Sequence, residues 1–150
     1  MVKPFICIAM AGCILLFHPL AIQAHQHERP KPRTVTGIQI TEVGKSDDDN
    51  DELEKKYCKA FKPSRSEVKR FFLNAYAVPA KMGAHDRYSP CYAKGSVEFS
   101  DNTRGKWKLS SSGNGTLFWD TGDVAHLFHR GYRWNDPFAC TYGPTSEGEC

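Results

Sequence analysis

Hydrophobic positions change their spacing near Cys91, and this change divides the chain into two parts. Upstream of Cys91, apolar side chains recur every three or four residues, which is the spacing of one face of a helix. Downstream, apolar and polar residues alternate, as they do along a strand that is buried on one side only. The pattern predicts an α+β fold in which helices precede an antiparallel sheet.

The first predicted helix follows a run of acidic residues and ends before Pro63. Acidic side chains gather at its start and lysines later, an order that the helix dipole favours. Pro63 ends the helix because proline lacks the backbone N–H that the next turn needs. The apolar stripe of this helix consists of Leu53, Tyr57, Ala60 and Phe61.

The second predicted helix begins at Ser64 and ends before Pro79. Ser64 and Glu67 have the spacing of a capping box, in which each side chain binds the other residue's backbone N–H. Such a short helix is marginal alone, so its apolar stripe is expected to cover a sheet. The stripe consists of Val68, Phe71, Phe72 and Ala75.

Four strands are predicted downstream of Cys91, and short turns join them. Asn114-Gly115 is expected to form one of these turns, because both residue types tolerate positive φ. Connections this short make neighbouring strands antiparallel. The predicted fold is therefore two short helices packed on a four-stranded antiparallel meander, stapled by disulfides. The strands are residues 96–99, 106–109, 116–119 and 124–128, with Val97, Phe99, Trp107 and Leu109 facing the helices.

Aromatic residues mark the expected limits of the folded domain. All sixteen that follow the first 24 residues lie between Tyr57 and Tyr142. Because aromatic side chains dominate core burial, a single globular domain is predicted over residues 52–150. Residues 25–51 are interpreted as a flexible arm and acidic linker. Residues 34–43, rich in β-branched side chains, are either an edge strand or part of that arm.

Residues 1–24 have the layout of a secretory signal peptide. Lys3 supplies the positive charge, an apolar run covers residues 5–20, and Ala24 offers a small residue for cleavage. A periplasmic or secreted protein is therefore expected, with no membrane span after removal of the signal, since no other segment approaches about 18 apolar residues. A lipoprotein site at Cys13 and an uncleaved anchor are the alternatives.

Removal of the signal leaves four cysteines, an even number that predicts a disulfide framework in an exported chain. Three pairings are possible, and closeness in sequence favours Cys58–Cys91 with Cys140–Cys150. Zinc binding or a reactive thiol is the rival interpretation, but no CxxC or His-x-x-x-His spacing accompanies these cysteines. The same 126 residues carry 19 basic and 17 acidic side chains, too small an excess to suggest nucleic-acid binding.

Two candidate sites involve histidines. Cleavage after Ala24 would start the chain with His25-Gln26-His27, whose amine, amides and imidazoles suit Cu(II) or Ni(II) in a square plane. His85 and Asp86 are adjacent, so the carboxylate could orient the imidazole of a small secreted hydrolase. No nucleophile motif and no phosphate-binding loop accompanies them, so a protein that is not an enzyme is expected, with these two as alternatives.

Residues 130–138 combine aromatic and charged side chains in a segment with no regular period. Tyrosine, tryptophan and arginine are enriched where proteins bind one another, so this segment is a candidate contact with another extracytoplasmic protein. The alternative is that its aromatic residues close the open end of the sheet. An inhibitor-type or immunity-type protein is the expected function on the first interpretation. The predicted partner-binding residues are Tyr132, Arg133, Trp134 and Asp136.

Overall fold

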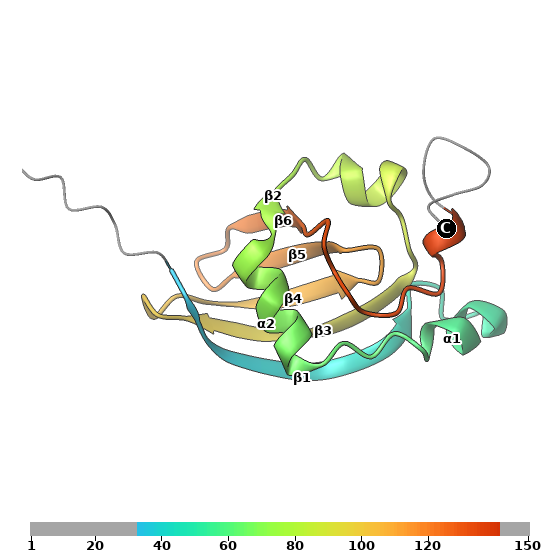
Figure 1. The fold of residues 1–150 in the computed structure, drawn as a ribbon, viewed down its shortest axis with the longest axis horizontal. Coiled ribbons are helices and arrows are strands. Elements are labelled where there is room, and N and C mark those ends of the chain that lie inside the picture. Colours follow the sequence, from blue (N-terminus) through green and yellow to red (C-terminus); the bar gives the residue numbers. More distant parts are fainter. Residues whose placement is uncertain (1–32, 142–150) are drawn as a thin grey trace, which may run out of the picture. The chain divides into compact units, whose positions relative to one another are not determined.

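A computed structural model describes residues 33–141, and six antiparallel strands form its sheet in the order β1-β3-β4-β5-β6-β2 (Figure 1). The predicted signal peptide and the candidate metal ligands His25 and His27 lie outside the described residues. The mixed α+β class is confirmed. The strands are β1 (Val35–Ser46), β2 (Tyr76–Ala77), β3 (Cys91–Phe99), β4 (Arg104–Ser110), β5 (Asn114–Trp119) and β6 (Val124–Phe128).

The prediction of four strands is wrong, because β1 and β2 extend the meander at its two edges. β1 is the longest strand, with 12 residues, and it pairs with β3 along most of its length. Of the two alternatives for residues 34–43, the edge strand is the one observed. The folded part of the chain therefore begins well before residue 52, so the predicted boundary falls inside it.

The helix predicted to open at Ser64 is present as α2 (Arg65–Asn74), and both bonds of the capping box are formed. Val68 and Phe71 are fully buried beneath it, and α2 lies across one face of the sheet (Figure 1). Two further helical segments, η1 (Met82–Asp86) and η2 (Ala139–Thr141), were not predicted. Within residues 33–141, no helix has both the length and the apolar character needed to span a membrane.

The other predicted helix is shorter than expected and buries a different face. α1 (Glu52–Cys58) begins at the capping residue Asp51 and ends well before Pro63. Leu53 and Tyr57 of the predicted stripe are more than half exposed, whereas Cys58 is fully buried. The reason is covalent, since Cys58 forms a disulfide with Cys91 at the start of β3 and so turns its own side of α1 inward.

This disulfide joins the pair that closeness in sequence favours. Cys58 and Cys91 are 33 residues apart in the chain, and their bond links α1 to the start of β3, the strand next to the edge strand β1. Cys140 is disulfide-bonded as well. Cys150, its predicted partner, lies outside the described residues.

The core lies between α2 and the face of the sheet that α2 covers, called here the inner face. Val97, Phe99, Trp107 and Leu109 are all at most 6% exposed, as predicted. Phe72 of α2 meets both Phe99 and Trp107 edge-on, with ring centroids 6.1 and 6.4 Å apart.

Asn114-Gly115 does not form the turn that was predicted for it. Both residues belong to β5, and the turn lies just upstream, where Gly113 has a φ of +84°. Gly115 is instead needed for packing, because an added Cβ would lie 2.5 Å from Leu109 and 2.9 Å from Phe71. The absence of a side chain at 115 therefore lets α2 approach the sheet closely.

Candidate binding site on the outer face of the sheet

The face of the sheet opposite α2, called here the outer face, carries mostly polar and charged side chains. Successive residues of a strand point to opposite sides, so the partners of the buried positions face outward. Paired strands place these residues in rows across the sheet. Two of the rows are Lys94, Lys108, Thr116 and His126, and Ser96, Lys106, Phe118 and Val124.

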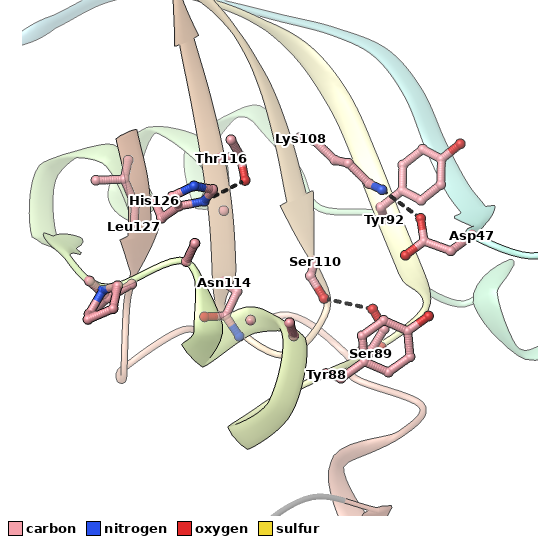
Figure 2. A pocket seen from close by; sticks show the side chains of 16 residues that line it. Asp47, Tyr88, Ser89, Tyr92, Lys108, Ser110, Asn114, Thr116, His126 and Leu127 are labelled. Carbon is pink, nitrogen blue, oxygen red and sulfur yellow. Dashed lines mark hydrogen bonds and ion pairs between the residues drawn. The ribbon is translucent and has the colours of Figure 1, made fainter. Parts of the chain in front are cut away.

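Residues 78–89, which include η1, fold over one end of the outer face and form one wall of an open pocket of about 310 Å³ (Figure 2). The covering segment contributes small and apolar side chains, among them Val78, Pro79 and Ala84. The strands beneath contribute polar side chains from β3 to β6. The pocket therefore has an apolar cover and a polar floor.

Asn114 lies at the inner end of this pocket and is 93% buried. Its Nδ2 donates hydrogen bonds to the Arg87 carbonyl oxygen at 2.8 Å and to the Ser112 hydroxyl at 3.1 Å. The carbonyl can only accept, so the orientation of the amide is fixed. Its Oδ1 is buried and finds no hydrogen-bond partner in the described part of the chain.

Two polar contacts lie at the floor of the pocket, one between side chains and one from a side chain to a backbone carbonyl (Figure 2). The Thr116 hydroxyl lies 3.3 Å from His126 Nδ1, and the two residues are direct neighbours on β5 and β6. The Ser110 hydroxyl donates to the Ser89 carbonyl oxygen at 3.1 Å, which ties the end of the cover to β4. These contacts hold the floor in one arrangement.

At the rim of the pocket, an ion pair lies against the face of an aromatic ring. Lys108 Nζ lies 2.6 Å from Asp47 Oδ1 and 4.3 Å from the centroid of the Tyr92 ring. A second ammonium group, on Lys94, lies 4.6 Å from the same centroid. An ammonium group over an aromatic face is attracted by the ring quadrupole. The charges at this rim are therefore largely matched before any ligand arrives.

Tyr88 stands at the same rim and is half exposed. Partial burial raises the pKa of its hydroxyl above the ordinary value, and the negative charges nearby raise it further. The hydroxyl thus stays protonated and can donate a hydrogen bond at neutral pH. The carboxylates that act on it are those of Asp47, Glu54 and Asp48.

Next to the pocket, the outer face exposes two apolar side chains. Phe118 of β5 is 46% exposed and Val124 of β6 is 53% exposed, and they lie directly opposite each other. Lys106 of β4 continues the same row. We call Phe118, Val124 and Lys106 the outer row.

The predicted partner-binding segment has a structural role in this protein. Trp134 is 8% exposed, its ring is stacked between Phe71 and Tyr132, and its Nε1 donates to the Ser111 carbonyl oxygen at 2.8 Å. Asp136 accepts hydrogen bonds from the Ser111 and Tyr132 hydroxyls. Arg133 is exposed. Partner binding through this segment stays a prediction, and Arg133 is the member best placed for it.

The residues proposed for a hydrolase do not meet at a site. His85 and Asp86 are both exposed on η1, and neither lines the pocket that η1 covers. Among residues 33–141, no cluster of three or more potential metal ligands occurs. The pocket offers hydrogen bonds and apolar contact, and the hydroxyl and imidazole that lie together in it belong to Thr116 and His126.

Asn114, Thr116 and His126 were not predicted as site residues. Because side chains alternate along a strand, the sequence does predict that these three residues share one face of the sheet. The missing part is the cover, because residues 78–89 show no helical or strand period that would place them over the sheet. The pocket thus depends on a long-range contact that no local pattern indicates.

Neither a family model nor a curated protein nor a solved structure matches this chain. The function must therefore be argued from the geometry of the fold and the site.

Proposed function

We propose that this is an exported binding protein that docks on another extracytoplasmic protein through the outer face of its sheet, without catalysis. The observation that carries the proposal is the outer row, where an aromatic and an aliphatic side chain stay exposed side by side on a sheet. Apolar side chains that adjoin one another on a surface are better candidates for an interaction site than apolar side chains exposed singly. The proposal includes inhibition of the partner on docking, as in an immunity-type protein.

Rigidity favours the outer face over a loop as the docking surface. β5 and β6 pair with each other through the outer row, and β5 is also paired to β4. A surface held by strands loses little conformational entropy when a partner binds. On the other side of the sheet, α2 and the core already occupy the inner face.

Export is supported by the disulfide between Cys58 and Cys91, because such bonds form and persist in oxidising compartments. Both cysteines are fully buried, which is how structural disulfides are placed. Periplasmic or secreted localisation is therefore part of the proposal, together with the signal peptide inferred from residues 1–24.

A second candidate surface is the segment around Arg133, which is exposed beside the buried Trp134. Two other candidate functions rest on the sequence alone. Copper or nickel binding through His25 and His27 is tested by copper titration of the mature protein with and without residues 25–27, where identical spectra would exclude it. A hydrolase is the less favoured of the two, since His85 and Asp86 do not line the pocket.

The docking proposal is tested by capture from the envelope or secreted fraction of the source organism. The double variant Phe118→Ser with Val124→Ser should lose at least about tenfold of the captured partner, since interface centres contribute upward of 1–2 kcal/mol. The matched control is Leu73→Ser on α2, which removes an apolar side chain that is 52% exposed. Arg133→Ala tests the second surface in the same assay.

Each outcome separates the alternatives. Loss of capture in the outer-row variant, with capture intact in Leu73→Ser and Arg133→Ala, supports the proposal. Loss in Arg133→Ala alone moves the docking surface to residues 130–138. Equal capture by all variants, or no specific capture by the native protein, contradicts docking through the outer face.

A further inference from the structure

The helices α1 and α2 and the segment between them carry a concentration of exposed positive charge. Between residues 55 and 70, seven side chains are basic and one, Glu67, is acidic. Lys55 is paired with Glu52, and the other six basic side chains are exposed and form no ion pair in the described part of the chain. Glu67 is occupied by the capping box of α2. Four of the six cations lie on α2 or just before it, namely Lys62, Arg65, Lys69 and Arg70.

These charges do not stabilise the helix that carries them. Arg65 is the first residue of α2, where the helix dipole disfavours a cation. Lys69 follows Arg65 by four residues, so two like charges are neighbours on the surface of the helix. An anionic surface outside the protein would reduce both penalties, because it supplies a counter-charge.

An exposed apolar side chain lies among the cations. Leu73 is 52% exposed and follows Lys69 by four residues and Arg70 by three, so these side chains share the outward side of α2. Val68 and Phe71, on the other side of the helix, are fully buried. Cations around an apolar side chain suit the interface of a lipid bilayer, where the cations meet anionic headgroups and the apolar group reaches the acyl boundary.

We propose that the outward side of α2 binds the anionic headgroups of a lipid bilayer and so holds the protein on a membrane surface. The proposal goes beyond protein docking, because α2 lies on the side of the sheet away from the outer face (Figure 1). A membrane bound through α2 therefore leaves the outer face free for a protein partner. The contact is made by Lys62, Arg65, Lys69 and Arg70, with Leu73 as the apolar group.

A second copy of the chain is a less favoured source of negative charge. Its acidic run, residues 47–54, is largely engaged within its own molecule. Asp47 is paired with Lys108, Asp51 caps α1, and Glu52 is paired with Lys55. A bilayer differs because it offers many anionic headgroups on one extended surface, which several cations can approach at once.

Co-sedimentation of the full mature protein with lipid vesicles tests the proposal. Each basic residue near an anionic leaflet strengthens binding by about fivefold, so four of them predict half-maximal binding at about 1 mM lipid. Vesicles that contain phosphatidylglycerol in phosphatidylcholine should bind the protein, and vesicles of phosphatidylcholine alone should not. Binding at about 0.1 M salt should be lost at about 1 M, because the Debye length falls from about 10 to about 3 Å.

Two double variants locate the contact on α2. Lys69→Gln with Arg70→Gln removes two charges, so the fraction bound at about 1 mM lipid should fall from about half to below about a tenth. The matched control is Lys81→Gln with Lys106→Gln, which removes the same charge from exposed positions on the covering segment and the outer face. This control should bind vesicles as the native protein does.

Loss of vesicle binding in the α2 variant, with binding kept in the control, supports the proposal. Equal losses in the two variants would overturn it, because net charge rather than α2 would then determine binding. No binding at about tenfold more lipid, or salt-sensitive self-association in place of vesicle binding, would overturn it as well.

The variants of the docking assay separate this proposal from the docking proposal. Phe118→Ser with Val124→Ser should bind vesicles as the native protein does, whereas Leu73→Ser should bind them more weakly. In the capture of a protein partner, the same two variants are expected to behave the other way round. Failure of the membrane surface is therefore distinguishable from failure of the docking surface.

Discussion

The two faces of one sheet use the same strands for opposite purposes. On the inner face, Trp107 is 1% exposed and Leu109 is fully buried beneath α2. One residue away on the same strand, Lys106 and Lys108 face outward, and Phe118 on the next strand stays half exposed. The core is therefore packed on the inner face, and the outer face keeps exposed side chains.

This difference indicates where function is carried. Changes on the inner face alter the core and hence stability, as cavities in packed interiors do. Changes at the exposed positions of the outer face meet solvent, where most single substitutions alter stability by less than about 0.5 kcal/mol. A substitution that affects binding without affecting stability should therefore be found on the outer face.

The largest expected contrast is between Trp107→Ala and Phe118→Ala. Trp107 lies against Phe72 and above Gly95, where an added Cβ would lie 2.5 Å from the indole, so truncation leaves a cavity that cannot collapse easily. Denaturant unfolding should show a loss of about 3–5 kcal/mol for Trp107→Ala and less than about 1 kcal/mol for Phe118→Ala. Similar losses of unfolding free energy in the two variants would contradict the proposed difference between the inner and the outer face.

Removal of the Cys58–Cys91 disulfide tests how α1 is held to the sheet. Replacing both residues by alanine frees a loop of 33 residues in the unfolded chain, which the chain-entropy relation converts to a loss of about 3–4 kcal/mol. The m-value should rise, because the unfolded state becomes more expanded. A change below about 1 kcal/mol would mean that the disulfide contributes little to the stability of the fold.

Trp134→Ala and Arg133→Ala separate structure from recognition within one segment. Trp134 lies at the margin of the core, so its truncation should remove about 3 kcal/mol of unfolding free energy, the lower end for tryptophan. Arg133→Ala should stay within about 0.5 kcal/mol of the native value. If Trp134→Ala kept full stability, its ring would be available to a partner and the segment would regain its predicted role.

The smallest expected effect is a pH dependence at the edge of the core. Burial lowers the pKa of His129, and the positive charge of Arg70 lowers it further, while its Nδ1 accepts from the Gly131 N–H at 3.3 Å. The unfolded chain therefore binds the proton more readily. The stability that neutral His129 contributes is fully present above about pH 6.5, the pKa of histidine in the unfolded chain. This stability is lost as the pH falls from there toward the lower pKa of His129 in the folded protein.

Unfolding free energies measured between pH 7.5 and pH 5.5 test this contribution. The native protein should lose stability more steeply over this range than His129→Gln, which cannot titrate. Parallel curves for the two proteins would show that His129 protonates equally well in the folded and unfolded states.

Local patterns in the sequence predicted those parts of the fold that local physics determines. The capping box of Ser64 and Glu67 predicts the start of α2. The alternation around Val97 and Trp107 predicts which residues of β3 and β4 face the core. β1 could not be placed in the same way. Its pairing partners on β3 lie between 45 residues (Ser46 with Cys91) and 64 residues (Val35 with Phe99) further along the chain, and three irregularities in its register interrupt the alternation that would identify a strand.

The candidate site was harder to predict than the fold because it combines a regular and an irregular element. Thr116 and His126 follow the strand alternation, so their common face is foreseeable from spacing. The cover is not, since Gly83 and its neighbours lack an apolar period. Leu53 and Tyr57 show the converse error, a helical stripe that the disulfide at Cys58 turns toward solvent.

The central claim is that the outer face binds while the inner face supports the fold. Its most direct test measures unfolding free energy and partner capture together in the double variant Phe118→Ser with Val124→Ser. The account predicts stability within about 1 kcal/mol of the native protein and a loss of capture of at least about tenfold. Unchanged capture, or a fall in stability large enough to explain the lost capture by unfolding, would contradict it.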